Sequence, residues 1–403
     1  MAWALRGILG FARGAEWVQI AAWWGFLPVF GAFCLLRWLL LPALLMSCMG
    51  LALGVQLWRA SEPGSLLARG PARALGGLAL FVHTIVGGSA LVLMLMPWDE
   101  GWTAVPGSGD WQDSVVLGRA GGGVVITTGG RDKGSYWREA GGAEYEARGL
   151  PGHMGWYLAE DRVRGAVWLA PTLGDVVTFH DLASRRWLEI KAPFEMSGAR
   201  GIAVSEGRVI VAGSGGLAWT DDAHEGWVFA ERGHFTGLAM DPGERRILAL
   251  GTRFVGSTDG GASWAEVPRP AEASLGAAAA IGADGQVYVV DGGIVTGGSL
   301  WTGPFGGPWE AREAPGGDLR EVAVDPGRSE HVVVGSWGEG VFESTDGGRS
   351  WAALGPRGVS VRALAVDFAG GEVHVASGNL VARRGVYVGR LGAREGVAGA
   401  RER

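Results

Sequence analysis

The sequence predicts an all-β domain, a β-propeller of about seven blades, preceded by an α-helical membrane region of two or three transmembrane helices. Three observations carry this prediction. Long uncharged apolar runs are confined to the first 97 of the 403 residues, the 72 glycines indicate many tight turns, and a tryptophan returns about every 40 residues in the second part of the chain.

The membrane region is expected to occupy residues 1–97. Its clearest element is the run 75–96, in which His83 is the one ionisable residue, and which is long enough as a helix to cross a hydrocarbon core of about 30 Å. An ionisable residue in mid-span is a functional candidate, but a neutral histidine that bonds within the helix bundle is the simpler explanation. Residues 38–58 form a second span. Pro28 interrupts the apolar run 17–36. Two interpretations of this run stay open, a short third span and an interfacial helix.

The arginines predict how this region is oriented. The loop 59–74 carries three of them, whereas the segment after residue 97 has no basic residue before Arg119. Basic loops tend to stay in the cytoplasm. We therefore expect an integral membrane protein whose propeller lies on the extracytoplasmic, periplasmic side.

The composition argues against several kinds of function. Both cysteines, Cys34 and Cys48, lie in the apolar part, so the second part has neither a disulfide framework nor a cysteine-ligated metal site. Residues 1–97 contain six arginines and two glutamates, whereas the whole chain has a net charge of −6. The second part is therefore acidic, and we expect no nucleic-acid partner. The histidines of this part show no metal-ligand spacing, and we expect no metal or cofactor.

A repeat is visible in the second part. Three segments of alternating apolar residues end in Asp241, Asp325 and Asp367, which are 84 and 42 residues apart, or two periods and one. Tryptophans are spaced by 40, 37, 45 and 42 residues, at Trp187, Trp227, Trp264, Trp309 and Trp351. This period fits the four-stranded blade of a propeller.

Seven units follow from the period, and they start near residues 113, 154, 200, 234, 274, 318 and 359. The last unit lacks an outer strand, while residues 101–105 form an unassigned strand before the first unit. We therefore expect residues 101–105 to close the ring by pairing with residues 385–390, because an open blade edge would leave backbone groups unpaired. The propeller would span residues 98–391, and residues 392–403 are expected to be a disordered tail.

Two eight-residue motifs share the pattern Ser-x-Asp-x-Gly-x-Ser-Trp. Their defining residues are Ser257, Asp259, Gly261 and Trp264 in the first copy, and Ser344, Asp346, Gly348 and Trp351 in the second. A carboxylate and hydroxyls at this spacing bond back to the turn backbone, the glycine accepts a positive φ, and the tryptophan packs between sheets. Eroded copies lie before Trp227 and Trp309.

These motifs resemble the Asp-box of the bacterial-neuraminidase-repeat propellers, a superfamily that includes sialidases, sortilin-type receptors and photosystem II assembly factors. The resemblance covers about residues 98–391. It implies that the Asp-boxes lie between the third and outer strands and are structural, so Asp259 and Asp346 are not expected to be catalytic. The sialidases resemble one another in a Phe/Tyr-Arg-Ile-Pro segment that this sequence lacks. We therefore expect no enzyme; if the chain has an activity, the resemblance implies a glycosidase.

The face opposite the Asp-boxes is the candidate binding face. Seven arginines are expected there or at its rim: Arg131, Arg200, Arg253, Arg320, Arg362, Arg383 and Arg384. They could be ordinary solvated side chains, but guanidinium groups gathered on a concave face would select anionic partners. The resemblance to assembly factors and sortilin-type receptors implies a polypeptide ligand. We therefore expect a non-catalytic, membrane-anchored scaffold that binds a protein.

Two other functions stay open. Four carboxylates are expected on loops of one face, where a pair of them could serve a glycan-binding or glycoside-hydrolysing site, although scattered surface carboxylates explain them as well. They are Asp132, Asp175, Asp291 and Glu339. The other open function is that of a sensor or transport accessory, for which the sequence shows neither an ion path nor a signalling domain.

Overall fold

The computed structural model describes residues 40–59, 69–95, 101–107, 112–117, 124–128, 135–139, 142–147, 156–171, 173–184, 186–197, 201–222, 226–270, 272–274, 278–293, 297–356, 359–378 and 384–392. The chain divides into two units, unit 1 (Met1–Pro97) and unit 2 (Trp98–Arg403). The division falls where the composition of the sequence changes.

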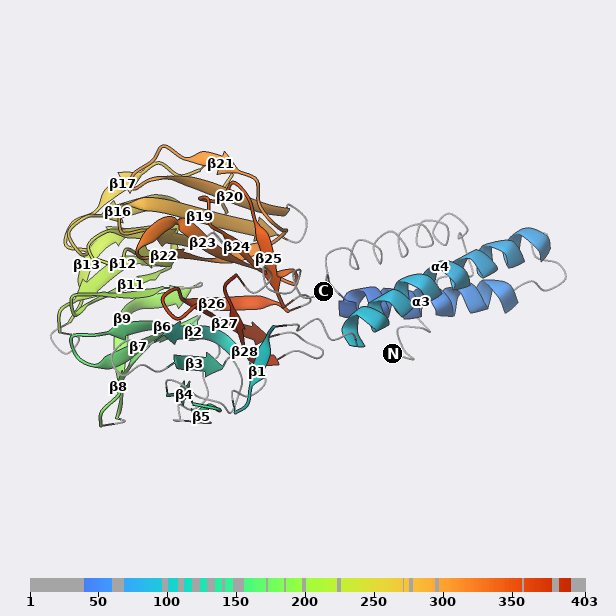
Figure 1. The fold of residues 1–403 in the computed structure, drawn as a ribbon, viewed down its shortest axis with the longest axis horizontal. Helices are drawn as coiled ribbons and strands as arrows, with labels where there is room; N and C mark the ends of the chain where they lie inside the picture. Colours follow the sequence, from blue (N-terminus) through green and yellow to red (C-terminus); the bar gives the residue numbers. More distant parts are fainter. Residues whose placement is uncertain are drawn as a thin grey trace, which may run out of the picture. The chain divides into compact units, whose positions relative to one another are not determined.

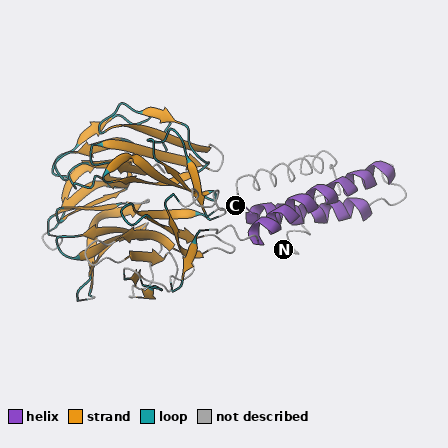
Figure 2. Ribbon diagram, viewed as in Figure 1, coloured by secondary structure: helices purple, strands orange, loops and turns teal. Residues whose placement is uncertain are grey.

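The described part of unit 1 consists of two helices that pack against each other, α3 (Leu40–Arg59) and α4 (Arg69–Leu95) (Figures 1 and 2). They correspond to the predicted runs 38–58 and 75–96, and residues 17–36 lie outside the described part. Over the residues that the structure describes, neither helix combines the length and the hydrophobicity needed to cross a membrane.

Small residues allow α3 and α4 to approach closely. Ala43 and Ala90 are fully buried. Gly50 of α3 faces the imidazole of His83 on α4, and a Cβ at position 50 would overlap that ring. His83 is thus a buried residue of the contact between the two helices.

The described strands of unit 2 form seven four-stranded antiparallel sheets. The first three sheets consist of β2 (Gln112–Leu117), β3 (Val124–Thr128), β4 (Ser135–Arg138) and β5 (Glu146–Ala147); β6 (Trp156–Asp161), β7 (Ala166–Pro171), β8 (Leu173–Asp181) and β9 (Trp187–Ser197); and β10 (Ile202–Ser205), β11 (Arg208–Gly213), β12 (Gly216–Thr220) and β13 (Val228–Arg232).

The next three sheets have the same sequential order. They consist of β14 (Phe235–Met240), β15 (Ile247–Gly251), β16 (Phe254–Ser257) and β17 (Ala265–Val267); β18 (Ala278–Ile281), β19 (Gln286–Gly293), β20 (Gly297–Pro304) and β21 (Glu310–Arg312); and β22 (Leu319–Asp325), β23 (Arg328–Ser336), β24 (Gly340–Ser344) and β25 (Ala352–Gly355). The last sheet combines β26 (Val361–Asp367), β27 (Glu372–Gly378) and β28 (Arg384–Arg390) with β1 (Thr103–Val105).

The first strands of the sheets contact one another in a closed cycle. The order is β2, β6, β10, β14, β18, β22 and β26, and β26 contacts β2 again. Within each sheet, the other three strands follow the first strand outward, one beside the next. Figure 1 shows these sheets stacked side by side. This is the arrangement of a β-propeller. The prediction of an all-β domain is confirmed, and each first strand begins within four residues of its predicted start.

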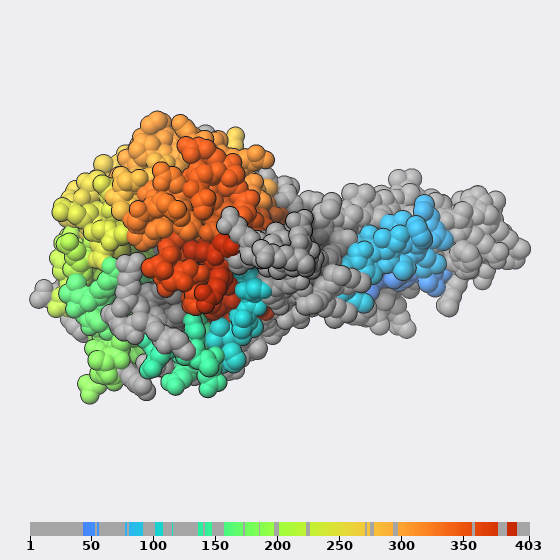
Figure 3. All heavy atoms as spheres, viewed as in Figure 1, coloured from blue at the N-terminus to red at the C-terminus, as the bar shows by residue number. Residues whose placement is uncertain are grey.

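The last sheet takes its outer strand from the beginning of unit 2. β1 pairs antiparallel with β28, so that Thr103 lies opposite Val388 and Val105 opposite Val386. In the space-filling view the red residues of this sheet lie beside the cyan segment that holds β1 (Figure 3). The predicted pairing of residues 101–105 with residues 385–390 is confirmed.

The ends of the strands define two faces of unit 2. One end carries the turns between first and second strands, such as residues 325–328, and those between third and fourth strands, such as residues 345–351. We call it the box face. The other end carries the loops between second and third strands, such as residues 337–339, and the entries to the first strands. We call it the opposite face.

Apolar side chains fill the space between neighbouring sheets. Leu217 of β12 packs with Phe235 and Val255 of the following sheet. Farther along the chain, Leu300 of β20 packs with Val332 of β23. Because each apolar layer belongs to two sheets, hydrophobic burial joins every such sheet to the next and keeps the loops of one face in fixed positions.

Candidate ligand-binding face

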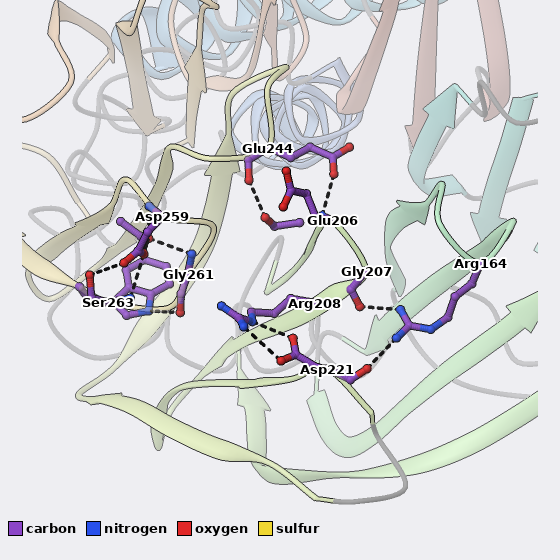
Figure 4. Close-up of polar contacts among 12 residues, drawn as sticks. Arg164, Glu206, Gly207, Arg208, Asp221, Glu244, Asp259, Gly261 and Ser263 are labelled. Carbon is purple, nitrogen blue, oxygen red and sulfur yellow. Dashed lines mark hydrogen bonds and ion pairs between the residues drawn. The ribbon is translucent and has the colours of Figure 1, made fainter.

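The two motif turns are held by hydrogen bonds to their own aspartate and first serine. In the first copy the hydroxyl of Ser257 donates to Oδ1 of Asp259 (2.8 Å) and accepts from the backbone N–H of Gly261 (2.8 Å). The carboxylate of Asp259 accepts from the N–H (2.9 Å) and the hydroxyl (2.6 Å) of Ser263 (Figure 4). The second copy repeats this pattern around Asp346, at distances of 2.5 to 2.9 Å.

These bonds fix the charge of the two aspartates. The hydroxyl and the N–H of Ser263 lower the pKa of Asp259 to about 2, and those of Ser350 hold the pKa of Asp346 well below its ordinary value. A carboxylate that stays ionised and is already bonded to its own turn is a poor proton donor. The geometry therefore gives Asp259 and Asp346 a structural role.

The motif tryptophans and glycines connect each turn to the preceding sheet. Trp264 packs with Leu217 of β12, and Trp351 packs with Leu300 of β20. Gly261 and Gly348 have φ angles of 85° and 81°, a region that favours glycine. These contacts explain why the motif combines a glycine with a tryptophan three residues later.

Other charged residues of the box face join neighbouring sheets. Arg164 donates to the backbone oxygens of Gly207 (2.5 Å) and Asp221 (2.6 Å) in the next sheet, and the Asp221 carboxylate pairs with Arg208 at 2.8 Å (Figure 4). Glu244 accepts from the N–H of Glu206 at 2.8 Å. The charges of this face thus serve contacts between sheets.

The opposite face brings two predicted arginines together around one aromatic ring. Arg320 and Arg362 are the second residues of β22 and β26, the first strands of adjacent sheets. Their guanidinium carbons lie 5.8 and 5.5 Å from the centre of the Trp337 ring. Trp337 follows β23 and forms a bridge with Ser360 at the entry to β26. Both arginines are within the range of cation–π attraction.

Two carboxylates border this group. Asp318 has a left-handed backbone (φ 48°), and its backbone oxygen accepts from the N–H of Trp337 at 3.0 Å. Its Oδ1 lies 2.7 Å from Nε of Arg320. Glu339 accepts from the N–H of Gly317 at 3.3 Å. We call Asp318, Arg320, Trp337, Glu339 and Arg362 the Trp337 cluster.

The other predicted arginines do not join this cluster in the described part. Arg253 pairs with Glu231 at 2.5 Å and donates to the backbone oxygen of Arg232 at 3.0 Å. Arg384 begins β28, but its side chain is outside the described part. Arg131, Arg200 and Arg383 also lie outside the described residues.

The carboxylates considered for glycan chemistry have local partners. Asp175 pairs with Lys191 at 3.5 Å, and Asp291 accepts from the hydroxyl of Ser274 (2.8 Å) and the N–H of Gly292 (2.9 Å). Glu339 holds the β21–β22 connection, and Asp132 lies outside the described part. Within the described ranges no group of histidines, cysteines and carboxylates has the arrangement of a metal site.

Two features escaped the sequence analysis. Trp337 does not belong to the tryptophans that recur about every 40 residues. Its position between two sheets depends on a contact with the next sheet, which a local sequence pattern does not reveal. Asp181 forms a motif-like turn in which the N–H (2.6 Å) and hydroxyl (2.8 Å) of Ser184 bond to its carboxylate. Relative to the aspartate, Ser184 and Trp187 are each displaced by one residue from the spacing of the motif. The turn around Asp181 therefore does not match the motif in the sequence.

Comparisons with known proteins agree with the fold. No family model and no curated protein matches the sequence. Among solved structures, the GH74 xyloglucanase from Xanthomonas campestris is 20% identical, covering 72% of this chain and 53% of that one, with a TM-score of 0.56. YCF48 from Cyanidioschyzon merolae is 16% identical over 73% of this chain and 99% of its own (TM-score 0.55). YCF48 bound to D1 peptide is 14% identical over 72% and 97% (TM-score 0.52).

These likenesses define the class of protein. Unit 2 is a β-propeller whose solved neighbours include GH74 and YCF48 propellers. This chain spans about half the length of the xyloglucanase and nearly all of YCF48. At such low identity the likeness establishes the fold alone, because one propeller fold serves many functions.

Proposed function

We propose that the chain is a membrane-anchored, non-catalytic propeller of seven blades with Asp-box turns, which binds an acidic segment of a protein partner through the opposite face. The observation that carries the proposal is the placement of both Arg320 and Arg362 at the ring of Trp337, 5.8 and 5.5 Å from its centre. Aromatic and arginine side chains are the residues most enriched at binding hot spots.

The chemistry of the cluster suits a carboxylate ligand. A guanidinium group presents paired donors that match the two oxygens of a carboxylate. The ring of Trp337 limits the positions that both arginines can adopt, so less conformational entropy is lost when a ligand binds. The box face, by contrast, uses its charges within the protein, as Arg164 and Arg208 show.

The solved neighbours support a polypeptide ligand. One of them is YCF48 bound to D1 peptide. This likeness supports a peptide as the class of ligand. We propose that the partner of this chain exposes a segment with aspartate or glutamate side chains.

Membrane anchoring is proposed from the surface of unit 1. Large apolar side chains are exposed on both helices, including Leu45 on α3 and Phe81 on α4, whose exposed fractions are 54% and 64%. Exposed apolar surface of this kind is normally covered by a partner or by lipid. We propose lipid, with unit 2 on the extracytoplasmic side. Alkaline phosphatase fused after residue 100 should be active in the periplasm, and an inactive fusion contradicts this orientation.

Binding can be tested with the full-length protein in detergent and a fluorescent peptide that carries several glutamates. The peptide should bind, and the variant Arg320→Ala/Arg362→Ala should lose at least about tenfold in affinity, as measured by fluorescence anisotropy. A glutamine version of the peptide should not bind. Arg208→Ala is the matched control, because Arg208 also lies on a tryptophan, 4.0 Å from the ring of Trp219, but on the box face.

A glycan ligand is the second candidate. Trp337 is partly exposed, and a sugar ring could stack on it. The GH74 neighbour acts on a polysaccharide according to its name, xyloglucanase. Turnover of a glycoside by the full-length protein, lost in Glu339→Gln, would favour this candidate over the scaffold.

A further inference from the structure

We propose that Asp318 competes internally with the partner for Arg320 and so limits the affinity of the Trp337 cluster for acidic ligands. This inference rests on the proposed function of the opposite face. Asp318 carries a negative charge and therefore does not itself attract an anionic ligand.

The position of the Asp318 side chain is unusual for a carboxylate. Only 6% of it is exposed, and Oδ1 lies 2.7 Å from Nε of Arg320. Among the described residues, neither carboxylate oxygen has a hydrogen-bond partner. A buried carboxylate without hydrogen bonds is costly unless a neighbouring positive charge offsets the loss of hydration. The charge of Arg320 therefore holds Asp318 in place, and Asp318 in turn holds Arg320.

This ion pair affects any anion that approaches Trp337. The side chain of Arg320 is 39% exposed, so a ligand can reach it, but the ligand has to share its charge with Asp318. Glu339, the other carboxylate of the cluster, accepts from the backbone N–H of Gly317. Asp318 forms an ion pair with Arg320 and is therefore a direct competitor for this arginine.

The backbone of Asp318 has a separate structural role. Its φ of 48° suits the turn into β22, and its backbone oxygen holds the N–H of Trp337. Asparagine adopts this backbone conformation as readily as aspartate and keeps the same shape. Asp318→Asn therefore removes the charge while it preserves the loop that positions Trp337.

The test compares full-length protein and Asp318→Asn, with the glutamate-rich fluorescent peptide as the probe. We expect Asp318→Asn to bind about fivefold more tightly, since a partly exposed charge contact is worth roughly that factor. The matched control is Glu313→Gln, which removes an exposed charge from the same β21–β22 connection and should leave the affinity unchanged. In an Arg320→Ala background, Asp318→Asn should have no effect, because the competition acts through Arg320.

The outcomes separate this inference from the function on which it rests. The melting temperature of Asp318→Asn shows whether this variant is folded. If the original protein binds the peptide, and the folded variant binds it with equal or lower affinity, the role of Asp318 is wrong and the proposed function stands. If neither protein binds the peptide, the proposed function is wrong, and this inference falls with it. Equal gains in Asp318→Asn and Glu313→Gln would show a general charge effect and contradict the role of Asp318.

Discussion

The indole nitrogen of Trp102 donates a hydrogen bond of 2.9 Å to the backbone oxygen of Leu354, which lies 252 residues later. Trp227 and Trp309 make the same kind of bond to the preceding sheet, at 2.9 and 2.5 Å. Trp102 thus takes the place of the periodic tryptophan in the last sheet, although it precedes the first sheet in the sequence.

Trp102→Ala should therefore destabilise unit 2 strongly. Trp102 is buried between β28 and the preceding sheet, and removal of a buried tryptophan costs about 3–5 kcal/mol. The free energy of unfolding can be measured by urea titration with circular dichroism. Thr103→Ala, an exposed position of the same strand, should change it by less than about 0.5 kcal/mol. Equal effects of the two changes would show that Trp102 does not close the ring.

The two motif turns should respond to loss of their carboxylate. Asp346→Ala removes the acceptor of the bonds from Ser350, and we expect a loss of about 1–2 kcal/mol in unfolding free energy, as for a helix cap. Thr345→Ala, at the exposed neighbouring position, is the control. Peptide binding by Asp346→Ala should match that of the original protein. A selective loss of binding without loss of stability would contradict the structural role.

His374 should make the stability of unit 2 depend on pH. It is 1% exposed, and burial lowers its pKa from 6.5 to about 4. The charge of Arg138 lowers the pKa further, the charge of Asp367 raises it, and burial is the largest of the three effects. Between pH 6.5 and 4 the unfolded chain binds the proton and the folded one does not, so stability is full above pH 6.5 and falls as the pH is lowered.

The size of this effect can be isolated with His374→Leu. From pH 7.5 to 4.5 the original protein should lose on the order of 2 kcal/mol more than the variant, when the unfolding free energy is measured at several pH values. Parallel pH profiles for the two proteins would show that His374 is not the responsible group.

Gly50 should be needed for the packing of α3 on α4. A Cβ at this position would overlap the ring of His83, whereas a Cβ on Gly88 would meet no atom within 4 Å. Gly50→Ala should therefore lower the melting temperature of unit 1 in detergent, and Gly88→Ala should not. The comparison is controlled because both changes place the same methyl group on one of the two packed helices.

Features that depend on residues close together in the chain could be predicted from the sequence. The motif turns around Asp259 and Asp346, the starts of the first strands, and the pairing of β1 with β28 all follow from spacing and from the need to satisfy strand edges. Arg320 and Arg362 were expected at the opposite face because loops between successive blades form it, and both residues lie at the entries to first strands.

Features that depend on contacts between sheets could not be predicted from the sequence. The position of Trp337 against Arg362 joins two sheets, and the bonds of Arg164 to Gly207 and Asp221 do so as well. Such contacts depend on how far apart and at what angle the sheets pack. Arg253 lies in the β15–β16 loop of the opposite face, as expected, and its pairing with Glu231 is a further contact that the sequence pattern did not reveal.

The most direct test of the central claim is site-specific photo-crosslinking of the full-length protein in its native membrane. Benzoylphenylalanine would replace the exposed Glu313 in the β21–β22 connection of the opposite face or, in a separate variant, the exposed Thr258 in the first motif turn of the box face. The account predicts a crosslinked protein partner from position 313 that is absent from position 258 and is reduced by Arg320→Ala/Arg362→Ala. A partner captured from position 258 and not from position 313 would contradict the claim that binding occurs through the opposite face.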